Sequence, residues 1–238
     1  MKIFLNQYQS RYPRRINSNE LDKYTISPWA KPQLIKYGPN SILSQKISNQ
    51  LYGISIFNLQ ILRPGNLHFK FQHSAYVLQL MTAGKLSYAC PGGVNVNLNP
   101  SQYCLCYFPK GFKEVFFNPG HYEFIQMEIS HLWINYLLGR DHMIAEAMLR
   151  LLPISGCFRA LPTEDFSESI RFINIMRGRS DSWRDLHFRN VTLVQYLLEK
   201  YCTALYDHRI RPPLLTSQSN LPYFKITNHE NHYQSKRH

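Results

Sequence analysis

Residues 73–129 alternate short apolar runs with turn residues, and this pattern constrains the fold more than any other feature of the chain. The interruptions are Gly84, Pro91-Gly92-Gly93, Asn99-Pro100, Pro109-Lys110-Gly111 and Asn118-Pro119-Gly120. Glycine and proline mark turns, and short apolar runs between turns have the length of β-strands. Turns that recur about every 8–12 residues are typical of an antiparallel sandwich or barrel. The sequence therefore predicts a small all-β unit here.

Two hairpins are expected inside this region. Gly84 would turn the chain between Tyr76–Met81 and Leu86–Cys90, and Pro91-Gly92-Gly93 would turn the next hairpin. Pro100 and Pro109 mark strand ends, because proline cannot donate a hydrogen bond to a ladder.

Two further strands precede the region. Residues 51–62 are rich in β-branched and aromatic side chains and end at a turn signal, Arg63-Pro64-Gly65. In residues 67–72, Leu67, Phe69 and Phe71 alternate with polar side chains, which predicts a half-buried strand. Residues 1–50 contain Pro13, Pro28, Pro32 and Pro39 and are expected to form an extended arm that could lie across the barrel mouth.

After Ile129 the apolar period becomes helical. Ser130 is a candidate N-cap for a helix whose apolar face carries Leu132, Trp133, Tyr136 and Leu137. A second helix is predicted over residues 143–152, and a third starts at Thr163 with Glu164 and Asp165 in its first turn.

The last predicted helix covers about residues 185–206. Its apolar residues follow a 3, 4, 3, 4 spacing: Val191, Val194, Leu198, Tyr201 and Leu205. Such a seam packs on the core of its own domain or forms a dimer contact, and two repeats leave both open. The expected segments are an arm (1–50), a barrel (51–129), a helical segment (130–206) and a disordered tail or linker (207–238).

The charge is concentrated in the flanks. The net charge is +12, and residues 1–50, with eight Lys and Arg and two acidic residues, contribute +6 of it. Basic flanks favour a polyanion such as nucleic acid, or they are solvated tails. Five scattered cysteines form no disulfide framework, and no signal-peptide core or membrane-length apolar run is present, so a cytoplasmic location without membrane association is expected.

Residues suited to catalysis do not form a recognisable set. His68 and His73 point to opposite faces of a strand, His121 and Glu123 supply only two ligands on one face, and Cys104 and Cys106 share a face without a CxxC pair. No nucleophile elbow or phosphate-binding glycine loop is present. We expect no catalytic residue, no metal and no cofactor.

The turn-bounded runs Val94–Pro100, Tyr103–Gly111 and Pro119–Tyr122, with Gly84 at a hairpin, resemble a cupin-type barrel. In particular, residues 50–206 are similar to the N-terminal effector-binding and dimerisation domain of AraC-family transcriptional regulators of the kind common in Bacteroidetes. The resemblance implies an α+β fold: a cupin-like antiparallel β-barrel or sandwich followed by a C-terminal helical dimerisation segment.

The resemblance also implies a function. The domain would bind a small effector, such as a sugar or another metabolite, form a homodimer, and reach DNA only through a helix-turn-helix domain. Residues 207–238 lack the pattern of such a domain, so we expect a fragment, a truncated regulator or a stand-alone sensor. Barrel mouths favour pockets of aromatic and a few polar groups. The ligand-binding candidates are His73, Gln79, Tyr88, Tyr103, Tyr107 and Gln126.

The chain departs from the metal-binding cupins. Their His-x-His and Glu ligands would fall on Phe71, His73 and Val77, so one of three is present, and Lys113 and Glu114 stand where the second motif has a histidine. This departure argues against catalysis. The alternatives are a metal-dependent cupin enzyme and an independent basic nucleic-acid-binding protein.

Overall fold

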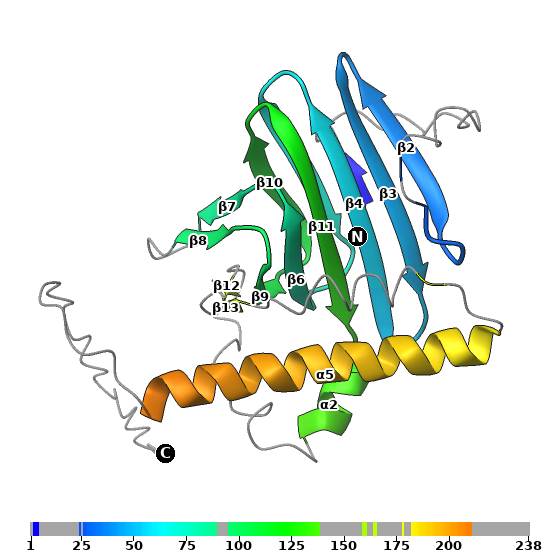
Figure 1. The fold of residues 1–238 in the computed structure, drawn as a ribbon, viewed down its shortest axis with the longest axis vertical. Helices are drawn as coiled ribbons and strands as arrows, with labels where there is room; N and C mark the ends of the chain where they lie inside the picture. The colour runs from blue at the N-terminus through cyan, green and yellow to red at the C-terminus, as the bar shows by residue number, and fades with distance from the viewer. Residues whose placement is uncertain are drawn as a thin grey trace, which may run out of the picture.

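The computed structural model describes residues 2–4, 24, 26–89, 95–138, 159–160, 164–165, 178 and 182–210 (Figure 1). Its strands are β1 (Lys2–Phe4), β2 (Lys31–Tyr37), β3 (Asn40–Ser48), β4 (Tyr52–Ile61), β5 (Gly65–Phe71), β6 (Ala75–Ala83), β7 (Leu86–Ala89), β8 (Asn95–Leu98), β9 (Gln102–Phe108), β10 (Gly111–Phe117), β11 (Gly120–Ile129), β12 (Arg159–Ala160) and β13 (Glu164–Asp165). Its helices are α2 (His131–Leu138) and α5 (Trp183–Ile210).

One large antiparallel sheet organises the molecule. Its strands run in the order β12-β9-β6-β11-β4-β3-β2, and β13 also pairs with β9. A three-stranded sheet, β1-β5-β10, and the β7-β8 ribbon form separate sheets. The predicted class is confirmed: an antiparallel sandwich is followed by a C-terminal helical segment.

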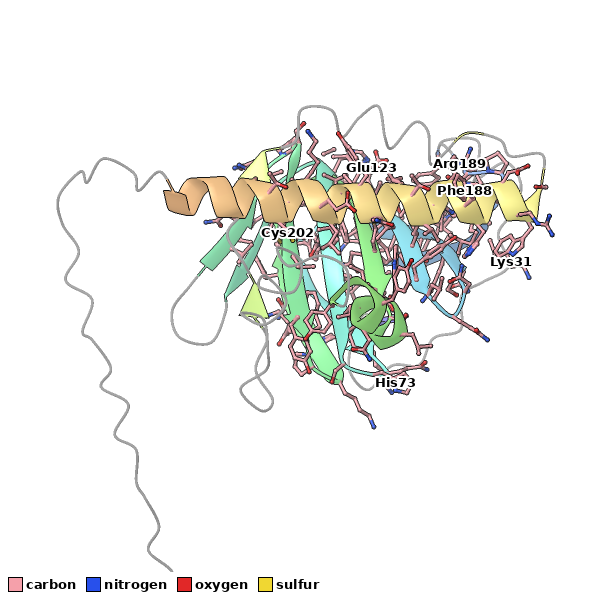
Figure 2. The ribbon with its side chains drawn as sticks, turned by 90° about the horizontal axis from the view of Figure 1, so that it is seen from below. Lys31, His73, Glu123, Phe188, Arg189 and Cys202 are labelled. Carbon is pink, nitrogen blue, oxygen red and sulfur yellow. The ribbon has the colours of Figure 1, made fainter. Side chains whose placement is uncertain are left out.

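The large sheet is buried on both faces. One face packs against β5, β10, β7 and β8 through an aromatic core that includes Phe57, Phe69, Phe117 and Phe124. The other face packs against α2 and α5, which runs across the strands (Figures 1 and 2). Burial on both sides explains why Tyr52–Phe57 at the start of β4 are all buried rather than alternating.

The turns confirm most of the predicted strand ends. β7 and β8 pair as predicted, and Pro109 follows the end of β9. Gly84 has a positive φ of 80°, and a Cβ there would lie 2.7 Å from the His121 carbonyl oxygen, so this turn requires glycine. The predicted hairpin at Gly84 is wrong, however. β6 pairs with β11 and β9, which occupy both its edges, so β7 continues into another sheet.

The sheet begins earlier in the sequence than residue 51. Residues 31–37 and 40–48, predicted as part of an extended arm, form β2 and β3 of the large sheet. Pro32 is tolerated because β2 is an edge strand, where one side of the backbone needs no donor. Pro39 lies in the turn between the two strands, next to Gly38 with its positive φ of 54°.

The helices start at serine caps. Ser130 Oγ accepts a hydrogen bond from Trp133 N at 3.2 Å, as predicted, and Ser182 Oγ accepts one from Asp185 N at 3.1 Å. The buried face of α2 is formed by Trp133 and Ile134, whereas Leu132 and Tyr136, predicted on that face, are exposed.

The predicted helix start at Glu164 and Asp165 is also wrong. These residues pair with Tyr103 and Gln102 as β13, because the edge of β9 is open to them. The predicted helix over residues 143–152 lies outside the described residues. Of the predicted tail (207–238), residues 207–210 belong to α5 and the rest lies outside the described residues. Neither α2 nor α5, the helices described, is long and apolar enough to cross a membrane.

Candidate functional site

A pocket of about 340 Å³ opens at one end of the sandwich. Its walls come from the end of β3 and the β3–β4 turn, from the β5–β6 turn and from the end of β11. The polar side chains that line it include Lys46, Asn49, Tyr52, His73, Glu128 and Ser130, and Phe71 and Ala75 supply apolar wall. The volume is at the lower end of the range of small-molecule sites.

An ion pair lies in this pocket. Lys46 Nζ is 3.7 Å from Glu128 Oε1, and the two side chains are 38% and 22% exposed. The ladder places Gly53 between Ser48 and Glu128, so no side chain fills the space there. A partly solvated pair contributes only about 0–1 kcal/mol to stability, so a ligand can replace either contact at low cost.

A row of polar side chains leads from Lys46 into the sandwich. Register places Lys46 opposite Ser55, Ser55 opposite Gln126, and Gln126 opposite Gln79, whose other neighbour is Cys104. Ser55, Gln126, Gln79 and Cys104 are at most 2% exposed. Gln126 Oε1 has no hydrogen-bond partner in the structure. A buried acceptor without a donor is costly, so this row is unusual among the aromatic side chains around it.

Large described side chains pack closely in the interior of the sandwich. Phe71 and Phe108 stack with ring centroids 4.6 Å apart, and Phe57 and Phe124 are 5.0 Å apart. Cys104 Sγ and Cys106 Sγ are 3.2 Å apart, and both are fully buried. Within the part of the chain that the structure describes, these contacts form a core at the centre of the sandwich, and the pocket lies at its end.

The six predicted ligand residues do not converge on one point. His73 is exposed on the pocket wall and lies at the edge of the molecule in Figure 2. Gln79 and Gln126 face each other in the polar row. Tyr103 and Tyr107 lie on the opposite face of the sheet, where Tyr103 contacts Tyr201 of α5 at 5.0 Å between ring centroids. Tyr88 lies in β7, and its side chain is outside the described residues.

Sequence reasoning missed Lys46, Asn49, Tyr52 and Glu128. They come from segments far apart in the chain: Lys46 and Asn49 were assigned to the arm, and Tyr52 and Glu128 to strands of the barrel. Residues 42–47 do not alternate between apolar and polar side chains, so no sequence signal marked Lys46.

The positions of the cupin metal ligands do not suit a metal here. Phe71 and Val77 are buried apolar side chains of the aromatic core, and only His73 could ligate. Within the part of the chain that the structure describes, no three His, Cys, Asp or Glu side chains group closely enough to hold a metal ion.

The predicted dimer seam lies mostly inside the chain. Val194, Leu198 and Tyr201 are fully buried against the large sheet, and Val191 packs at the margin of the same core. The side chain of Leu205 lies outside the described residues. Of the two options that the sequence left open, the structure places this face in the core. A dimer contact through α5 stays a prediction, and it would need another face of the helix.

Comparisons with known proteins give structural matches alone. No family model matches the chain, and no curated protein matches it. Among solved structures, the AraC-like transcriptional activator CuxR matches over 69% of this chain at 7% identity, with a TM-score of 0.43. An oxalate decarboxylase matches over 52% of this chain at 12% identity, with a TM-score of 0.33, and the match spans 36% of the enzyme's own length.

A cupin-2 domain of Rhodospirillum rubrum matches over 53% of this chain and 92% of its own length, at 15% identity and a TM-score of 0.31. The chain spans 55% of the length of the AraC-like activator. The solved structures that it is similar to thus include a transcriptional activator, an enzyme and an isolated cupin-2 domain.

Proposed function

We propose that the chain is the small-ligand-sensing and dimerisation domain of an AraC-type transcriptional regulator. The observation that carries the proposal is the pocket at the end of the sandwich, where a charged pair, Lys46 and Glu128, meets an apolar wall. Pockets for small molecules combine an apolar wall with a few polar groups in this way.

The ligand is a small polar metabolite in this proposal. Lys46 and Glu128 offer a donor and an acceptor at the pocket, and the buried amide side chains of Gln126 and Gln79 lie behind them in the same row. The His73 side chain at the exposed wall is free to turn toward a ligand that enters. Tyr103 and Tyr107, on the opposite face of the large sheet, are not part of this proposal.

The proposal is of a binding domain and not of a metal-dependent enzyme. It is supported by the apolar side chains, Phe71 and Val77, at the positions where metal-binding cupins carry ligands. Elemental analysis of the purified protein tests this point. Stoichiometric iron, manganese or zinc would favour the enzyme instead.

Thermal-shift screening against sugars and other small metabolites tests the proposal, because a compound that binds only the folded state raises its stability. We expect a hit to raise the melting temperature of the parent and of Lys85→Met, which alters an exposed lysine in the β6–β7 turn. The shift should be lost in Lys46→Met and in Glu128→Gln. A hit that acts equally on all four proteins binds elsewhere, and a screen without hits contradicts ligand sensing.

A further inference from the structure

The pocket shares two wall residues with a contact to α5. Asn49 Nδ2 lies 2.9 Å from Nδ1 of His187, in the second turn of α5. The Tyr52 ring stacks on the His187 ring with centroids 5.6 Å apart and an interplanar angle of 14°. Asn49 and Tyr52 also line the pocket. One layer of side chains therefore separates the pocket from the start of α5.

The hydrogen bonds of Asn49 determine which atom donates in its contact with His187. Asn49 Oδ1 accepts hydrogen bonds from Leu51 N at 2.8 Å and from Tyr52 N at 3.0 Å. Its amide nitrogen must then be the group that faces His187, and an amide NH2 can only donate. His187 Nδ1 is therefore the acceptor of this hydrogen bond, which places the ring proton on Nε2.

The second helix is joined to the same wall. Ser130 lines the pocket and caps α2 through Oγ, and its own backbone nitrogen donates to Leu51 O at 3.0 Å. Trp133 of α2 lies 6.3 Å from Tyr52 between ring centroids. Tyr52 thus contacts both helices, and it is only 2% exposed. A shift of the β3–β4 turn cannot leave these contacts unchanged, because packed side chains have little free space.

We infer that His187 is the positioning residue through which α5 responds to the occupancy of the pocket. A ligand that displaces the β3–β4 turn changes the Asn49–His187 hydrogen bond and the Tyr52–His187 stack together, and the first turns of α5 change their stability in response. This inference rests on the proposed function of the pocket and assigns the regulation of that site to one side chain.

The test uses an occupant of known chemistry, so it does not wait for the natural ligand. In Ser48→Cys, an exposed side chain of the pocket wall is labelled with benzyl methanethiosulfonate, which tethers a benzyl group there. Gln60→Cys, exposed at the far end of β4, carries the same label as the control. Hydrogen–deuterium exchange then reports on the amides of residues 183–195, with labelled parent as the baseline.

We expect the label at position 48 to change exchange in residues 183–195 by about fivefold or more, the lower end of typical coupling, and the label at position 60 to leave it unchanged. In the background of His187→Phe, which keeps a ring but has no acceptor, the response should be lost. His187→Asn, which restores an acceptor near the position of Nδ1, should recover part of it. An equal response with and without His187→Phe, or no response to the label at position 48, would overturn the inference.

A spectroscopic measurement checks the geometry independently. The ¹⁵N resonances of His187 should show an unprotonated Nδ1 in the parent. In Asn49→Asp, the carboxylate can still accept from Leu51 N and Tyr52 N, and its second oxygen should draw a proton to Nδ1. A protonated Nδ1 in the parent overturns the inference. If the metabolite screen gives no hit but the label at position 48 changes exchange as expected, only the proposed function is contradicted. If the screen gives a hit but the label has no effect through His187, only the role of His187 is contradicted.

Discussion

At the scale of single residues, the polar row inside the sandwich contains a side chain that does not stabilise the fold. Gln126 is 2% exposed, and its Oε1 has no hydrogen-bond partner. A buried polar group without a partner costs about 1–3 kcal/mol, whereas an apolar side chain of similar shape does not pay that cost. Because this cost brings the fold no stability, we propose that Gln126, two residues from Glu128 of the pocket wall on β11, acts in ligand binding.

The substitution Gln126→Met tests this explanation. Because methionine is similar in shape and needs no partner, we expect the free energy of unfolding to stay within about 1 kcal/mol of the parent or to rise. Binding of a metabolite found in the screen should weaken in the same variant. Urea unfolding and calorimetric titration measure the two quantities. A large loss of stability with unchanged binding would assign Gln126 to the fold.

Tyr52 gives a prediction for alkaline pH. Burial raises the pKa of Tyr52 above its ordinary value of 10.0, and the side chains of Asn190 and Asn49 oppose the rise in part. Since the folded state holds this proton more tightly than the unfolded state, the contribution is complete below about pH 10 and is lost as the pH rises through the folded pKa. Stability should therefore fall above about pH 10.

The variant Tyr52→Phe should weaken this fall without abolishing it, because burial also raises the pKa of Tyr76 and Tyr122. Unfolding in urea at about pH 8 and about pH 11 measures the difference. Tyr37→Phe, at an exposed position on the edge strand, is the control and should follow the parent. An alkaline loss of the same size in Tyr52→Phe would contradict the assignment.

At the scale of secondary structure elements, α5 has one buried apolar face and, near its start, two exposed aromatic side chains. Val194, Leu198 and Tyr201 are fully buried on the sheet, whereas Phe188 is 73% and Trp183 is 58% exposed. Phe188 and Arg189 lie on the same part of α5 in Figure 2. A dimer that used the heptad seam would have to remove α5 from its own core, so a contact through the Phe188 face is the less costly arrangement.

Two substitutions distinguish these faces. Leu198→Ala should lower the free energy of unfolding by about 2–5 kcal/mol, as expected for a cavity in a packed core, without a change in oligomeric state. Phe188→Ser should change stability by less than about 0.5 kcal/mol and should shift a dimer toward monomer. Urea unfolding and sedimentation velocity report the two effects. A Leu198→Ala protein that is fully folded and monomeric, beside a dimeric parent, would instead support the seam.

Local patterns predicted the elements whose identity depends on their own residues. The alternation of Leu67, Phe69 and Phe71 predicted β5, the cap at Ser130 predicted the start of α2, and the long apolar period predicted α5. The elements that were not predicted depend on contacts with residues far away in the sequence. β2 depends on an edge position that tolerates Pro32, and β13 depends on an open edge of β9. The pocket joins three distant segments, so no local pattern marks it.

At the scale of the whole molecule, the basic N-terminal region also supplies two strands of the large sheet. Leu43 and Ile42 of β3 are buried, and β3 pairs along most of β4. Lys31 and Lys36 of β2, in contrast, are exposed. The basic flank that suggested nucleic-acid binding is thus built partly on strands that the sheet needs, and removing the flank would remove both properties at once.

A chain without residues 1–50 should therefore fail to unfold cooperatively, because its β4 becomes an unprotected edge and the apolar side chains that packed against Ile42 and Leu43 are exposed. The double substitution of Lys31→Gln and Lys36→Gln removes charge and keeps the strands, so its melting curve by circular dichroism should match the parent. Any loss of polyanion binding in the double variant then reports on charge alone. A truncated chain that melts cooperatively at the temperature of the parent would show that β2 and β3 are dispensable, and the first fifty residues would be an arm after all.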